Sequence, residues 1–179
     1  MESDDIRCTD LLGFPPVLDA CCGGKMMWFD KQDRRALCVD IRREEHHDLD
    51  SRSKTVFRVE PDQIADFRNL PFPSDTFAHV VFDPPHCTRN SKNGRTSKKY
   101  GDLKGEWREM LRAGFAECFR VLRPDGTLIF KWNETDILVS EILALTPHAP
   151  LYGHRSGKAS KTHWVAFVKP NDKVRDGGH

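Results

Sequence analysis

Residues 79–86 have the sequence His-Val-Val-Phe-Asp-Pro-Pro-His. The run His79–Phe82 is typical of a short strand buried on both faces, and Asp83 stands where that strand ends. Two successive prolines then fix the backbone, so the Asp83 carboxylate and the Pro84 carbonyl can each accept one N–H of a planar amino group. The stretch therefore predicts a site that binds an amine, although Asp-Pro-Pro turns also end strands that carry no chemistry.

A second signal lies upstream in residues 17–24, which have the sequence Val-Leu-Asp-Ala-Cys-Cys-Gly-Gly. Here a short apolar strand ends near Asp19 and is followed by small residues and by a predicted helix over 25–33. Glycines let backbone N–H groups approach a ligand, and a helix start presents further free donors. The pattern indicates a nucleotide-cofactor loop, or, taken alone, a plain structural turn. The fuller Gly-x-Gly-x-x-Gly of a nicotinamide cofactor site is absent.

Asp40 supports the cofactor interpretation. It follows the predicted strand 36–39 and stands about 20 residues after the loop, where an acid can accept both ribose hydroxyls of a nucleotide. A solvated aspartate in a turn is the alternative.

Composition limits the class of protein. The chain of 179 residues corresponds to one domain, and 38% hydrophobic with 31% charged residues is typical of a soluble globular protein. No apolar run approaches the roughly 20 residues that span a bilayer, and the acidic start Met1–Asp5 does not resemble a signal peptide, so we expect a cytoplasmic protein. The six cysteines include no Cys-x-x-Cys pair, and His46-His47-Asp48 has no third ligand at a recognisable spacing, so we expect no metal.

The charge is unevenly distributed although the net charge is only +1. Residues 86–105 hold a single acid, Asp102, against six cations: Arg89, Lys92, Arg95, Lys98, Lys99 and Lys104. Such a local excess can bind phosphate. We interpret residues 86–105 as a basic substrate loop that covers the site, with Tyr100 as a stacking residue; a solvated charged loop is the alternative.

Alternating strands and helices predict an α/β fold with an open, mostly parallel sheet that ends in an antiparallel hairpin. The predicted strands are 17–20, 36–39, 63–66, 79–82, 127–132, 150–154 and 162–168. The predicted helices are 25–33, 106–122 and 136–145, with a turn at 124–126. We expect one domain over 1–179, with an N-terminal arm at 1–14 and a frayed tail at 171–179.

In this order and spacing, the two motifs resemble those of class I (Rossmann-like) S-adenosylmethionine (SAM)-dependent methyltransferases, especially enzymes that methylate adenine N6 in nucleic acids. The chain also resembles short methyltransferases of phages and prophages, through Asp19–Gly23, Phe82–His86 and Phe130–Glu134. The resemblance covers about residues 17–169 and implies the strand order 3-2-1-4-5-7-6 with the last strand antiparallel. The loop departs from the common Asp/Glu-x-Gly-x-Gly-x-Gly pattern, because Cys21 and Lys25 replace the outer glycines.

The resemblance implies a role for particular residues. Asp66 would accept from the cofactor's adenine amine, Phe67 would pack on that ring, and His86 takes a place that is usually aromatic. The implied cofactor-binding residues are Asp19, Ala20, Cys21, Gly23, Asp40, Ile41, Asp66, Phe67 and Asp83. The implied catalytic residues are Asp83, Pro84, Pro85 and His86. Substrate contacts are expected from Arg89, Lys92, Arg95, Lys98, Lys99, Tyr100 and Asn133.

The function expected from the resemblance is methyl transfer from SAM to an exocyclic amine of a nucleic-acid base, with adenine N6 in DNA favoured over RNA. The alternatives are an RNA guanine amine, a protein or small-molecule substrate, and a SAM- or nucleic-acid-binding module without catalysis. Because the chain has no room for a separate target-recognition region, we expect low sequence specificity, a short context or a partner protein. The oligomeric state stays open.

Overall fold

The computed structural model describes residues 13–47, 56–88, 95–103, 105–157 and 160–171. Most of the predicted N-terminal arm and of the predicted tail therefore lies outside the described residues. Phe14, at the end of the predicted arm, packs edge-on against Phe72, with 5.5 Å between the ring centroids.

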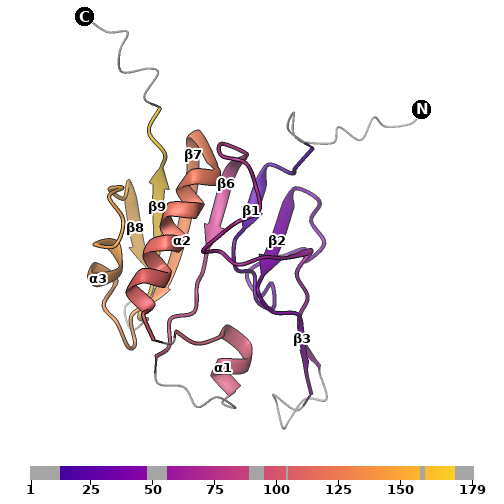
Figure 1. Ribbon diagram of the computed structural model, residues 1–179. Helices are drawn as coiled ribbons and strands as arrows, with labels where there is room; N and C mark the ends of the chain where they lie inside the picture. Colours follow the sequence, from indigo (N-terminus) through magenta and orange to yellow (C-terminus); the bar gives the residue numbers. More distant parts are fainter. Residues whose placement is uncertain (1–12, 48–55, 89–94, 104, 158–159, 172–179) are drawn as a thin grey trace, which may run out of the picture.

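The described residues form a mixed α/β fold around a seven-stranded sheet, as the sequence predicts (Figure 1). Its strands are β1 (Val17–Asp19), β2 (Ala36–Asp40), β5 (Gln63–Ile64), β6 (Phe77–Phe82), β7 (Leu122–Asn133), β8 (Tyr152–Arg155) and β9 (Thr162–Val168). They lie in the order β5-β2-β1-β6-β7-β9-β8, which is the order 3-2-1-4-5-7-6 of the predicted strands. The pairs from β5 to β7 are parallel, whereas β9 is antiparallel to both of its neighbours.

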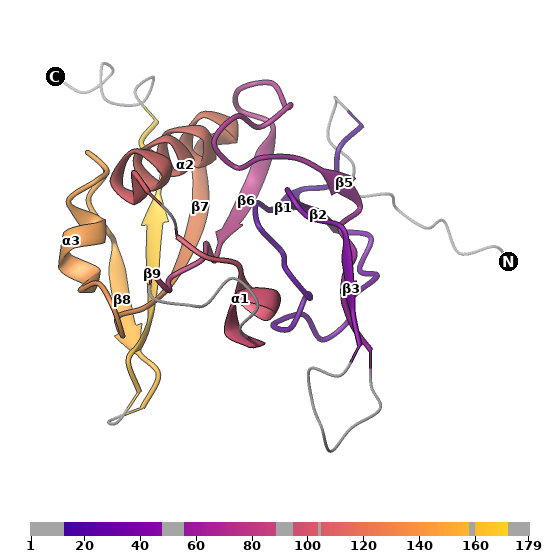
Figure 2. The ribbon, with the colours of Figure 1, turned by 60° about the horizontal axis from the view of Figure 1, so that its bottom comes forward.

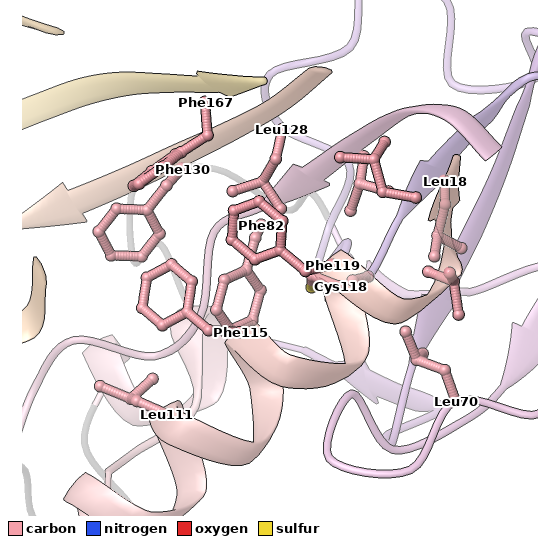
Figure 3. Close-up of a cluster of buried hydrophobic side chains, with 14 of the residues drawn as sticks. Leu18, Leu70, Phe82, Leu111, Phe115, Cys118, Phe119, Leu128, Phe130 and Phe167 are labelled. Atoms are coloured by element: carbon pink, nitrogen blue, oxygen red, sulfur yellow. The ribbon is translucent and has the colours of Figure 1, made fainter. Parts of the chain in front are cut away.

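Helix α2 (Trp107–Val121) covers one face of this sheet and confirms the predicted helix 106–122 to within one residue at each end. Its side chains Leu111, Phe115 and Phe119 point to the sheet, where they meet Phe82 and strand residues of β7 and β9 (Figure 3). The helix lies close to the sheet at Gly114, where a Cβ atom would stand 2.7 Å from the Phe82 ring. Burial of these apolar side chains is the main stabilising term of the fold.

The helix predicted over 25–33 is absent, because local side-chain contacts give this segment a turn conformation. Asp30 and Asp33 each accept a hydrogen bond from the backbone N–H two residues later, at 2.9 and 3.0 Å. Such Asx turns compete with helical hydrogen bonds, and a nine-residue helix has little stability of its own to oppose them.

The helix predicted over 136–145 is also shorter, since α3 covers only Val139–Leu143. The carboxylate of Asp136 accepts the Thr88 N–H at 2.8 Å and so joins the segment after β6 instead of capping a helix. Leu138 has an extended backbone (φ −65°, ψ 142°), so the helix begins after it.

Three further departures concern strands and connections. The turn predicted at 124–126 lies inside β7, where the β6–β7 register shifts between the pairs Phe77–Leu122 and His79–Thr127. Of the predicted strand 63–66, only Gln63–Ile64 forms a strand, β5. Asp66 begins a tight turn in which it forms an isolated β-bridge with Asn69. A second sheet of β3 (Glu44–His46) and β4 (Phe57–Val59) and the short helix α1 (Arg95–Tyr100) were not predicted.

The parallel strands β6 and β7 point to the same edge of the sheet, and α1 lies beyond that edge (Figure 1). Figure 2, with this edge turned forward, shows α1 in front of the sheet near the end of β6. In doubly wound sheets ligands bind at the carboxyl ends of the strands. Among the described residues, no helix has the length and apolar character needed to cross a bilayer.

Candidate functional site

The loop after β1 has a backbone that favours glycine at two positions. Gly23 has a φ of 51°, and Lys25 adopts the same positive φ of 51° although it is not glycine. The Gly23 N–H donates to Asp40 Oδ2 at 2.9 Å, which ties the loop to the end of β2. Asp40, the residue expected to bind ribose, therefore lies beside the loop, and Lys25 takes a conformation that favours the glycine it replaces.

Lys25 keeps this conformation through its side chain. Its ammonium group is buried and lies 2.8 Å from Asp62 Oδ1, while Asp62 Oδ2 accepts the N–H of Cys38 in β2. Burial opposes the charge on Lys25, but the contact with Asp62 outweighs it and raises the pKa of the ammonium group. Because Asp62 binds both Lys25 and Cys38, it connects the loop to strand β2.

Asp19 lies behind the loop and is almost completely buried. Its carboxylate accepts the indole N–H of Trp28 at 2.7 Å and the backbone N–H of Cys21 at 3.3 Å. Loss of hydration on burial raises the pKa of Asp19 to about 7, against these two hydrogen bonds, and the charges of Asp83 and Asp40 raise it further. Asp19 thus supports the loop from within.

Asp40 is held by Arg42 as well as by the loop. Its Oδ1 accepts the Arg42 backbone N–H at 2.9 Å and lies 3.2 Å from Arg42 Nε. Arg42 Nη1 also donates to the Lys98 carbonyl in α1 at 3.2 Å. This arginine therefore connects the end of β2 with the helix that lies over the sheet edge.

Asp83 forms an ion pair with a residue of the neighbouring strand. Lys131 Nζ, near the end of β7, lies 2.6 Å from Asp83 Oδ2. The following residues place His86 between two aromatic rings, with centroid distances of 5.8 Å to Tyr100 and 6.2 Å to Trp132. Burial lowers the pKa of His86, against the charge of Asp83, so the ring is neutral at neutral pH.

The end of helix α1 lies against Pro85 and His86. Gly101, with a φ of 73°, directly follows α1, and a Cβ atom there would stand 3.1 Å from Pro85 Cγ. The Leu103 N–H donates to the Cys87 carbonyl at 3.0 Å, which closes the segment from 87 to 103 at its base. The predicted substrate loop thus contains a short helix that lies against the predicted catalytic turn.

These elements enclose a cavity of about 90 Å³. Predicted residues from the three motifs and from α1 line it: Cys21, Gly23, Asp40, Ile41, Phe67, Asp83, Pro84, Pro85, His86, Lys99 and Tyr100. An adjoining cavity of about 570 Å³ is also lined by Ile41, Arg42, Phe67 and Pro85, and extends to Asp66 and Lys98.

Other predicted residues lie elsewhere. Asp19 and Ala20 are buried and are not among the residues that line either cavity. Asp66 reaches only the larger cavity, where Arg68 lies 2.5 Å from its Oδ2 and lowers the pKa of the carboxyl group. Asn133 lines neither cavity and bonds to Thr162 and Thr135.

Three predicted substrate contacts lie wholly or partly outside the described residues. Arg89 and Lys92 lie outside the described residues. For Arg95, the backbone in α1 is described but the side chain is not.

Six residues that line the first cavity were not expected from the sequence: Cys22, Gly24, Met26, Met27, Arg42 and Lys131. Trp28, the partner of Asp19, was missed as well. The signals were weak but present, because Arg42 stands two residues after Asp40 and Lys131 stands at the end of a predicted strand that reaches the same edge.

The residues around the cavity fit SAM in their chemistry. Asp40 offers carboxylate oxygens to ribose hydroxyls, although Arg42 and Gly23 already occupy part of its acceptor capacity. Met26, Met27, Ile41 and Phe67 provide apolar walls, and the carboxylate of Asp83 complements a positively charged ligand. The described residues hold no group of three or more side chains suited to a metal ion.

The sheet order and the single antiparallel strand next to its edge define the fold of the class I SAM-dependent methyltransferases. A SAM-dependent methyltransferase from Methanosarcina mazei shares this fold at 12% identity and a TM-score of 0.53, over 87% of this chain and 92% of that one. A TehB-like SAM-dependent methyltransferase from Corynebacterium glutamicum matches at 14% identity and a TM-score of 0.51, over 86% of this chain and 79% of that one.

A protein from Pyrococcus horikoshii matches with a TM-score of 0.55 and 18% identity, over 90% of this chain and 84% of that chain. No protein-family model matches the sequence, and no curated protein matches it either. At these identities the similarity establishes the fold alone.

Proposed function

We propose that the protein is a SAM-dependent methyltransferase that methylates an exocyclic amine of a nucleic-acid base, with adenine N6 in DNA as the favoured target. One observation carries the proposal: Asp83-Pro84-Pro85-His86 shares a cavity with Gly23 and Asp40, the residues expected to hold the cofactor. When bound, SAM supplies a methyl group activated by a positively charged sulfur.

The difficulty of the reaction is that an exocyclic amine delocalises its lone pair into the ring. The Asp83 carboxylate would accept one N–H and the Pro84 carbonyl the other, so that the lone pair is directed at the methyl carbon. With SAM bound, the amine so oriented would take the methyl group, and the electron pair of the broken C–S bond would stay on sulfur. The methylated nitrogen loses a proton to Asp83, which passes it to water.

The surroundings of His86 support a planar substrate. The neutral ring of His86 stands near Tyr100 at the cavity, so a flat base can pack against one of these rings. A neutral ring also adds no positive charge beside the cationic methyl donor.

Helix α1 supports a nucleic acid as the substrate. Lys98 and Lys99 form its last turn, and Lys99 lines the cavity. Two lysines beside the cavities can bind the phosphates that flank a target base. Extruding a base from a duplex costs a few kcal/mol, so single-stranded DNA should react faster than duplex.

The first test is to incubate the protein with methyl-labelled SAM and separate pools of single-stranded DNA, duplex DNA and total RNA. Each pool is digested and the methylated nucleoside is identified by mass spectrometry. We expect N6-methyldeoxyadenosine. Label in the RNA pool alone would replace DNA by RNA. If SAM binds but no pool is labelled, the target is not a nucleic acid or the protein is not a catalyst.

The second test is Asp83→Ala, which should abolish transfer and leave the affinity for SAM, measured by calorimetry, within a few-fold. Glu141→Ala serves as a control, because Glu141 is an exposed acid of α3 that pairs with Arg108 and lines neither cavity. Near-normal turnover of Asp83→Ala would exclude the mechanism.

A further inference from the structure

Lys131 occupies a position that the strand register dictates. Phe82 of β6 is paired with Phe130 of β7, so Asp83 and Lys131 follow as neighbours at the ends of the two strands, on the face opposite to these phenylalanines. The resulting ion pair joins Lys131 Nζ to Asp83 Oδ2 at 2.6 Å. The side chains of both residues are about one-quarter exposed or less, so the pair is only partly screened by water.

A second contact restricts the lysine. Lys131 is paired with Trp164 of β9, and its Nζ lies 5.5 Å from the centroid of the indole ring. A cation over an aromatic face is attracted to it, so the ammonium group has favourable partners on two sides. The side chain is therefore held at Asp83 instead of extending into solvent.

The ion pair also fixes which carboxylate oxygen is available. Oδ2 of Asp83 is bound by Lys131, while Oδ1 accepts no hydrogen bond from any of the described residues. The terminal torsion of an aspartate is broad, so a carboxylate without such a contact would rotate between orientations. The contact leaves Oδ1, on a cavity-lining residue, as the free acceptor.

Charge adds a second reason for a cation at this point. Asp83 lies close enough to the buried Asp19 for its charge to raise the pKa of that group, and Asp40 contributes in the same sense. Lys131, which also lines the cavity, balances one of these neighbouring acids.

We propose that Lys131 is a positioning residue for methyl transfer: it binds Oδ2 of Asp83 and thereby presents Oδ1 to the N–H of the target amine. This inference rests on the proposed function and deepens it. Lys131 is not expected to touch the methyl group or the reacting nitrogen.

The test compares Lys131→Met with Lys131→Arg, using labelled SAM and single-stranded DNA that contains adenine in all neighbouring contexts. We expect Lys131→Met to lower kcat by about 100-fold, the size of effect that a misplacement of about 1 Å produces. KM for DNA and the calorimetric affinity for SAM should stay within about threefold, and Lys131→Arg should restore most of kcat because it keeps the cation. Lys169→Met is the matched control, since Lys169 forms an ion pair of 2.7 Å with Asp75 near the opposite edge of the sheet.

A measurement without substrate tests the contact itself. In the ¹H–¹⁵N spectrum of lysine ammonium groups, the Lys131 signal is assigned by its loss in Lys131→Arg and should shift in Asp83→Asn. An unchanged signal would overturn the contact. A kcat of Lys131→Met within threefold of the wild type, or a loss that appears in KM instead of kcat, would overturn the positioning role while leaving the proposed function intact. If the wild type transfers no methyl group at all, the proposed function fails together with the role, whereas the spectrum still reports the ion pair.

Discussion

Asp19→Asn should change how the stability of the protein depends on pH. The carboxyl group is buried, and burial raises its pKa from the ordinary 3.8 to about 7. The folded protein therefore binds a proton between these two values that the unfolded chain has already lost. Stability contributed by this group is fully present below about pH 4 and is lost as the pH rises through 7.

The size of the effect follows from the two pKa values. Each pKa unit corresponds to about 1.4 kcal/mol, so the penalty of ionising Asp19 in the fold reaches about 4 kcal/mol above pH 7. Asparagine keeps an oxygen for the Trp28 N–H and does not ionise. The substitution also places an amide group near the Cys21 N–H, and the loss of folding free energy that this causes does not vary with pH in this range.

The assay is urea unfolding of the wild type and Asp19→Asn at several values between pH 5 and pH 8.5. We expect the free energy of unfolding of the variant, relative to the wild type, to increase by about 2.5 kcal/mol across this range, because the first part of the penalty has already developed below pH 5. The comparison cancels other titrating groups, since the two proteins differ at one side chain. A difference that stays constant within 1 kcal/mol would refute the argument that Asp19 is buried with a raised pKa.

Two further predictions concern the loop after β1 and the basic helix. Asp62→Ala leaves the buried ammonium group of Lys25 without its carboxylate partner and should lower the free energy of unfolding by on the order of 2 kcal/mol or more. Glu45→Ala, which removes an exposed ion pair with Arg58, should lower it by less than about 1 kcal/mol. Urea unfolding of both variants measures the two losses, and equal losses would contradict the prediction. Lys98→Glu combined with Lys99→Glu should weaken binding of single-stranded DNA and reduce the slope of log K against log salt by about 1.4, as expected for two lost phosphate contacts. Arg112→Glu on α2 is the control. A slope equal to that of the wild type would remove α1 from the proposed interface.

The strands of the sheet could be predicted because they obey one simple rule. Residues 162–168 form a continuous run that is mostly apolar and become β9 with the same bounds, and 79–82 lie within β6. A strand between two others needs only apolar side chains and a turn at its end, and both can be recognised locally. The topology then followed from the resemblance to a known class of enzymes.

The helices near the site were harder to predict, because they depend on competition between local and distant contacts. The apolar residues of 25–33 suit a helix, but Trp28 is bound to Asp19 and Lys25 to Asp62. Asp62 is 37 residues away in the sequence, so no local pattern contains this contact. The residues of α2, in contrast, face a single buried surface with helical periodicity, and there the prediction was confirmed.

The pairing of Asp83 with Lys131 shows why the site could be predicted only in part. The motif after β6 identifies Asp83, but its partner on β7 depends on how the two strands are aligned. That alignment is set by residues 123–126, which lie opposite the single residue Ala78 in the shifted register. One residue more or fewer in this bulge would turn the next side chain of β7 toward Asp83, and an apolar Phe130 or Trp132 would replace the lysine. The chemistry of the site therefore depends on a bulge at the opposite end of the strand, where the sequence itself indicates only a turn.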